Sequence, residues 1–229
     1  MTVISSLPKN NNTERKFIMA IEIKSKEREA VKNVVNTFGC VREDTLRKYL
    51  SLINTTRSSE DAIIKAVIAT TPFERNRTRK LTSFITRGSL ARSISFSAAD
   101  AFDAYVLLLQ EHISNSENPE NAIREAELVT VSRARYPYDF VASVGEYVYL
   151  IMSFNMKDSV RKILHHNKSE KNAHEMLVIV VPNGYGKEEI EGINVEGLYR
   201  LAKVNNIESQ ELNETVAECA ISPVLGKDR

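Results

Sequence analysis

The chain has 229 residues, which is enough for one large domain or two small ones. Hydrophobic residues make up 42% of it and charged residues 27%, an ordinary globular composition that excludes a disordered chain. The net charge of +1 is unevenly distributed, because residues 1–92 contain 18 Lys and Arg against 9 Asp and Glu, whereas residues 93–229 contain 13 against 21. This asymmetry indicates either an N-terminal half that binds a polyanion or two solvated surfaces of opposite sign.

Three features favour a soluble, cytoplasmic protein. Residues 1–12 are polar and lack the apolar core of a signal peptide. The longest apolar runs, such as residues 176–181, are too short to span a bilayer, so no membrane association is expected. Cys40 and Cys219 are isolated from each other in sequence, which favours buried thiols in a reducing compartment, with a single disulfide as the alternative.

Apolar spacing predicts three short helices after a flexible arm at residues 1–22. The first helix covers residues 26–38 and ends at Gly39, a typical residue at a helix C-terminus. The second helix follows after a short apolar link. The third begins after Ser58, with Asp61 at the capping-box position. Three helices with tight connections are the order of a helix-turn-helix unit.

A strongly basic stretch follows the third helix. Residues 73–92 carry six Lys and Arg but a single acidic residue, and residues 86–89 are a predicted turn. A hairpin in this position is the wing of a winged helix, and such a wing places basic side chains on phosphates. We therefore predict a winged helix-turn-helix domain over residues 23–95, with double-stranded DNA as its partner. The predicted DNA contacts are Arg57, Ser59, Lys65, Arg75, Arg77, Arg79, Lys80 and Arg87.

The same pattern allows an alternative. Three amphipathic helices and a hairpin also build protein-protein interaction modules that never bind nucleic acid. In that case the basic side chains would pair with the acidic C-terminal half of the chain.

Residues 96–229 are predicted to form an α/β domain with a mixed sheet, which makes the whole chain α+β. A long helix is predicted from Ser97, with Asp100 at the capping-box position, to about residue 113. Further strands are predicted at 128–131, 140–142, 147–154 and 176–181, and further helices at 158–165 and 195–204, before a short final strand.

The element order over residues 97–181 is similar to the restriction-endonuclease-like core. That core binds a metal ion through an acidic residue on its second strand and a Glu-x-Lys on its third. Asp139 lies at about the expected point, but Glu146 is followed two positions later by Val148 instead of Lys. A metal-dependent nuclease that uses Asp139 and Glu146 is therefore an alternative, and the preferred interpretation has no catalytic residue, no cofactor and no metal.

Two other motifs carry no predicted chemistry. His165, His166 and His174 lack the paired spacing of zinc ligands and are expected at the surface near a helix end. Residues 184–187 contain a Gly-Lys pair, but the first glycine and the hydroxyl residue of a phosphate-binding loop are missing.

Both halves together resemble the replication-relaxation type proteins of plasmids and other mobile elements. The resemblance is carried by residues 34–50, by the basic hairpin and by the helix and strands that follow. It implies a winged helix joined to a nuclease-like α/β domain that often lacks catalytic residues. We therefore predict a non-catalytic DNA-binding protein in replication control or regulation, whose α/β domain forms a homodimer or binds a protein partner.

Overall fold

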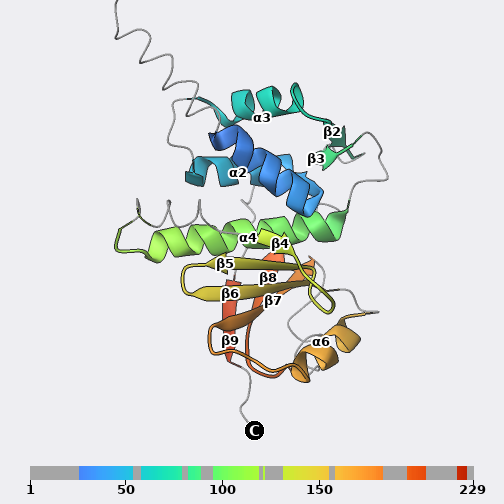
Figure 1. The fold of residues 1–229 in the computed structure, drawn as a ribbon, viewed down its shortest axis with the longest axis vertical. Helices are drawn as coiled ribbons and strands as arrows, with labels where there is room; N and C mark the ends of the chain where they lie inside the picture. Colours follow the sequence, from blue (N-terminus) through green and yellow to red (C-terminus); the bar gives the residue numbers. More distant parts are fainter. Residues whose placement is uncertain are drawn as a thin grey trace, which may run out of the picture.

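The computed structural model describes residues 26–53, 58–78, 82–88, 95–118, 121, 131–154, 158–182, 195–204 and 221–225. Over these residues the protein is α+β, as predicted, with a three-stranded antiparallel sheet and a six-stranded mixed sheet. Helices and the small sheet form one end of the molecule, the large sheet forms the other, and the long helix α4 lies between them (Figure 1). None of the described helices is long and apolar enough to cross a membrane.

The three predicted N-terminal helices are confirmed. The first is helical over residues 26–38 and ends at Gly39, whose φ of +78° disfavours any residue with a side chain. α2 (Glu43–Ile53) and α3 (Glu60–Ile68) follow. The short apolar link between the first two helices is a strand, β1 (Cys40–Arg42), in which all three residues are buried.

Two predicted helix starts are wrong by one or two residues. Ser59, not Ser58, caps α3, because its hydroxyl accepts the Ala62 backbone N–H. Ser95, not Ser97, caps α4 in the same way, through the N–H of Ala98. Asp61 and Asp100 are therefore one and two positions away from the capping-box position, and both make ion pairs instead.

The predicted hairpin is present, but its turn lies elsewhere. β2 (Phe73–Arg77) and β3 (Ser83–Arg87) pair antiparallel, and β1 adds to the other side of β3 to give the order β1-β3-β2. The chain therefore reverses between Arg77 and Ser83, and not at residues 86–89 as predicted. Thr86 is fully buried in β3, between Cys40 of β1 and Glu74 of β2.

The large sheet has the order β4-β5-β6-β7-β8-β9. Its first three strands form an antiparallel meander, α6 (Ser159–Asn167) crosses to β7, and β7 and β8 continue parallel to β6 before the antiparallel β9. The strand bounds are β4 Val131–Arg133, β5 Phe140–Val144, β6 Tyr147–Ser153, β7 Glu175–Pro182, β8 Leu198–Val204 and β9 Ile221–Leu225.

The helix predicted at residues 195–204 is wrong, because this segment contains β8. Tyr199 and Leu201 pack into the apolar cluster on one face of the sheet, and Ala202 and Val204 into the cluster on the other. A strand that is buried on both faces has no polar alternation, and periodicity alone does not separate such a strand from a buried helix.

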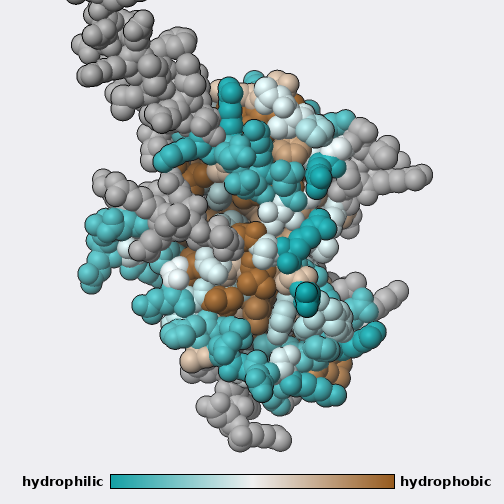
Figure 2. Space-filling model, viewed as in Figure 1, coloured by the Kyte–Doolittle hydropathy of each residue, from teal (hydrophilic) through white to brown (hydrophobic). Residues whose placement is uncertain are grey.

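One apolar core joins the helices to the large sheet through α4 (Phe96–Asn115). The ring of Phe38 lies 5.2 Å from that of Phe102 on α4 and 4.5 Å from that of Phe140 on β5, measured between centroids. The predicted boundary between residues 95 and 96 therefore falls at the start of a helix that contributes to the packing of both parts. Figure 2 shows hydrophilic side chains over the first helix and a band of apolar side chains where the helices meet the sheet.

Buried charges cross the same junction. Arg42 of β1 forms ion pairs with Asp100 and Asp103 of α4, and Thr45 of α2 donates a hydrogen bond of 2.6 Å to Asp103. Burial raises the pKa of Asp103 to about 6. Three elements are thereby fixed relative to one another by polar contacts as well as by packing.

Candidate nucleic-acid interface

The residues predicted to contact DNA come from α3 and from the β2–β3 hairpin. Lys65 is exposed on α3, Arg75 and Arg77 are exposed on β2, and Arg87 is the exposed last residue of β3. Ser59 is exposed too, but its hydroxyl already accepts a hydrogen bond as the α3 cap. Arg57, Arg79 and Lys80 lie outside the described residues.

Ion pairs with α2 occupy part of this charge. The Nη2 atom of Arg75 lies 2.8 Å from Oε1 of Glu43, whose side chain is only 3% exposed. Arg47 of α2 pairs with the same carboxylate and, at 2.8 Å, with Asp61 in the first turn of α3. The hydrogen bond from Arg47 lowers the pKa of Asp61, so this carboxylate stays charged at the start of α3. Arg75 therefore has less charge to offer a phosphate than its exposure alone suggests.

Arg77 and Arg87 make no ion pair with another described residue, whereas the charge of Lys65 helps to lower the pKa of Asp61 on the same helix. The Nε atom of Arg77 donates a hydrogen bond of 3.2 Å to Ser83 across the hairpin, which holds the guanidinium along the exposed edge of the two strands. Arg77 and Arg87 therefore leave positive charge on the hairpin side of the molecule that no ion pair with a described residue offsets.

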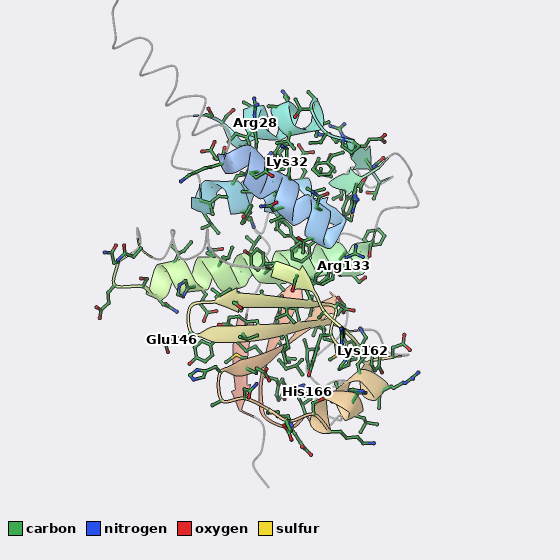
Figure 3. All side chains as sticks on the ribbon, in the orientation of Figure 1. Arg28, Lys32, Arg133, Glu146, Lys162 and His166 are labelled. Atoms are coloured by element: carbon green, nitrogen blue, oxygen red, sulfur yellow. The ribbon has the colours of Figure 1, made fainter. Side chains whose placement is uncertain are left out.

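A second basic group, which the sequence analysis did not predict, lies on the large sheet. Arg133 and Arg135 are exposed at the end of β4, and Arg161 is exposed on α6. Figure 3 shows Arg133 and Lys162 along one side of the molecule, below the hairpin of Figure 1. The alternation Arg-Ala-Arg at 133–135 was visible in the sequence, but the acidic balance of residues 93–229 concealed it.

The two carboxylates of the nuclease alternative are far apart. Asp139 precedes β5 and Glu146 lies in the turn after it, so roughly 20 Å of hairpin separates them and they cannot bind one ion. Figure 3 shows Glu146 at one end of the β5 and β6 strands and Lys162 beyond their other end. The Asp139 carboxylate accepts hydrogen bonds from the Nζ of Lys162 at 3.0 Å and from the Ser153 N–H at 2.7 Å.

Among the described residues, the neighbours of Asp139 on β6 offer no second metal ligand. Its neighbours on the same face of β6 are Leu150, Met152 and Phe154, all buried in the apolar cluster beneath α6. Across the part of the chain that the structure describes, no group of three His, Cys, Asp or Glu residues could hold a metal ion. Asp139 is therefore an ion-pair partner that ties α6 to the start of β5.

The histidine prediction is wrong for His166, which is 4% exposed. Its ring lies between the Tyr138 hydroxyl, 2.9 Å from Nδ1, and the Glu196 carbonyl oxygen, 3.2 Å from Nε2. Burial lowers the pKa of His166, so the neutral ring serves as a structural link. His165 and His174 are exposed as predicted, and Cys40 is a buried free thiol, whereas Cys219 lies outside the described residues.

Two basic surfaces thus follow one side of the molecule, and the described residues offer no metal-binding chemistry between them. Comparison of the chain with protein-family models, with curated proteins and with solved structures finds no match.

Proposed function

We propose that this chain is a non-catalytic DNA-binding protein whose N-terminal part is a winged helix. The observation that carries the proposal is the arrangement of that part. Three helices precede a hairpin, the strand between the first two helices pairs with β3, and the hairpin exposes arginines beside α3. In helix-turn-helix proteins the last of the three helices enters the major groove, and a neighbouring hairpin can contact phosphates.

The charges refine the expected contacts. Arg77 and Arg87 are the described side chains best suited to bind phosphate, because they are exposed and form no ion pair with a described residue; Lys65 is exposed too, but Asp61 offsets part of its charge. Arg75 contributes less, since Glu43 already binds its guanidinium. The first turn of α3 carries Glu60 and Asp61, which repel phosphate. We therefore expect the hairpin to contribute more to the DNA affinity than α3 does.

The non-catalytic part of the proposal is supported by the surroundings of Asp139. The order α4, three antiparallel strands, α6 and a parallel strand agrees with a restriction-endonuclease-like core. The positions beside Asp139 that would have to carry ligands are apolar, and Lys162 neutralises its charge. The role in replication control of a mobile element comes from the sequence resemblance.

A specific observation also favours the protein-interaction alternative. Arg42, one of the basic residues of the N-terminal half, pairs with Asp100 and Asp103 of the acidic half. This pairing is internal and buried, and it does not involve the hairpin arginines, so it leaves the proposed DNA contacts available.

The proposal is tested by charge reversal on the hairpin. Arg77→Glu is expected to weaken binding of a blunt random-sequence DNA duplex at least severalfold, because it removes one phosphate contact and adds a repulsion. Lys168→Glu is the matched control, since Lys168 is exposed at the end of α6, far from the hairpin (Figure 1). Equal affinity of the two variants and the unchanged protein would contradict the proposal.

A further inference from the structure

The second basic surface begins where β4 ends. β4 is the edge strand of the large sheet, and the chain that leaves it exposes Arg133, Arg135 and Tyr136 in close succession. With Arg87 from β3 and Arg161 from α6, these residues form what we call the junction strip. Charged side chains such as these arginines can protect an exposed edge strand from pairing with other strands. That protection does not explain the exposed aromatic ring of Tyr136.

Arg133 connects the strip to the hairpin. Its Nε donates a hydrogen bond of 3.2 Å to the carbonyl oxygen of Thr37, at the C-terminal end of the first helix, where the helix dipole favours a cation. Arg133 and Arg87 both line a hollow of about 490 Å³ between the helical part and the large sheet. Arg87 and Arg133 therefore place positive charge on both sides of this hollow, one from the hairpin and one from the sheet edge.

Tyr136 is held in the strip with about half of its surface exposed, at 49%. The guanidinium carbon of Arg161 lies 5.7 Å from its ring centroid, and the His165 ring meets it edge to face at 5.3 Å. These two contacts from α6 favour one orientation of the ring. An oriented, half-exposed aromatic side chain among arginines is the arrangement on which bases of single-stranded nucleic acid stack.

Among the described residues near the strip, acidic side chains do not cancel its charge. Asp139 also lines the hollow, but Lys162 and the Ser153 N–H bind its carboxylate. Residues 131–139 and 158–168 contain one other acidic residue, Asp158, which is exposed just before α6. The described residues therefore leave the four arginines in excess.

We propose that the junction strip binds a single-stranded segment of nucleic acid that continues from the duplex at the hairpin. Arg133, Arg135 and Arg161 bind its phosphates, Tyr136 stacks on one of its bases, and Arg87 contacts the duplex where the single strand begins. This inference rests on the proposed function for the position of the duplex, whereas the strip itself binds single-stranded nucleic acid. Val160 and Leu164 are exposed on α6 as well, at 46% and 53%, so a protein partner is the competing occupant.

The test compares three DNA probes by fluorescence anisotropy: a blunt duplex, the same duplex with an oligo(dT) tail of about eight nucleotides, and the tail alone. The tail is expected to tighten binding of the unchanged protein about tenfold, and Tyr136→Ala to remove most of this gain. Tyr136→Phe keeps the ring and is expected to keep the gain. Tyr147→Ala removes an equally exposed tyrosine at the opposite end of the β5–β6 hairpin and serves as the matched control.

The outcomes separate the inference from the proposed function. If the blunt duplex binds and depends on Arg77, but the tail adds nothing or Tyr136→Ala behaves like Tyr147→Ala, the inference is overturned and the proposed function stands. If the tail alone binds through Tyr136 while the blunt duplex does not bind, the single-strand site at the strip stands, and both the duplex proposal and the continuation of the strand from the hairpin fall. Binding of none of the three probes overturns both and leaves the face to a protein partner.

Discussion

At the scale of single residues, the most unusual feature is the pair of aspartates that share Arg42. Asp100 and Asp103 are 5% and 8% exposed, and one guanidinium cannot neutralise both. Burial raises the pKa of both carboxyls, to about 6 for Asp103. Because an exposed aspartate titrates near pH 4, the folded protein binds the extra proton between about pH 4 and 6. This group therefore favours folding at low pH, and its contribution is lost as the pH rises to 6.

Asp103→Asn tests that sign. The asparagine keeps the shape of the side chain and leaves Arg42 paired with Asp100, while it removes the titrating group. Relative to the unchanged protein, the variant is expected to gain about 2 kcal/mol of unfolding free energy between pH 4.5 and 7. Urea unfolding at the two pH values measures this difference. An equal difference at both values would show that Asp103 does not titrate in this range.

At the scale of elements, the start of α4 decides how the two parts of the molecule are connected. The hydroxyl of Ser95 caps this helix. Among the described residues, the hydroxyl of Ser97 forms a hydrogen bond only with the hydroxyl of Ser95. Ser95→Ala is therefore expected to lower the unfolding free energy by about 1 kcal/mol, and Ser97→Ala by a few tenths. Thermal unfolding of both variants is the measurement. A larger loss of unfolding free energy for Ser97→Ala than for Ser95→Ala would contradict this cap and favour the helix start at Ser97 that the sequence predicts.

The helices could be predicted from the sequence more easily than the helix caps or β8. Helices with one apolar face, such as residues 26–38 and α2, could be predicted because their period is distinct from that of a strand. The caps could not be assigned uniquely, because serines at 58 and 59, and at 95 and 97, all precede a helical pattern. β8 was mistaken for a helix because the sheet buries both of its faces.

The candidate site was predictable only in part, for an electrostatic reason. Local clusters of arginine on the hairpin are visible in the sequence, whereas the ion pairs that offset them join residues such as Arg75 and Glu43, 32 positions apart. The junction strip combines three separate segments, β3, the end of β4 and α6, and only the fold brings these together. Asp139 was identified as a candidate, but its partner Lys162 was not.

At the scale of the whole molecule, α4 joins the helical part and the large sheet through one apolar core, so we expect them to unfold together. Phe102 lies at its centre, with its ring 5.2 Å from that of Phe38 and 5.9 Å from that of Tyr49. Phe102→Ala is therefore expected to lower the unfolding free energy by about 3–5 kcal/mol while unfolding remains a single transition. Circular dichroism and tyrosine fluorescence along a urea gradient follow the two parts together. Two separate transitions in the unchanged protein would mean that the parts fold independently.

The central claim is that the hairpin side of this molecule binds the phosphates of duplex DNA. The measurement that tests it most directly is the salt dependence of duplex binding by the intact protein, with and without the double substitution Arg77→Glu and Arg87→Glu. Binding is expected to weaken steeply with salt, and the double variant is expected to reduce the slope of log affinity against log salt by about 2, one for each lost contact. An unchanged slope in the double variant, or no binding by the intact protein at low salt, would contradict the claim.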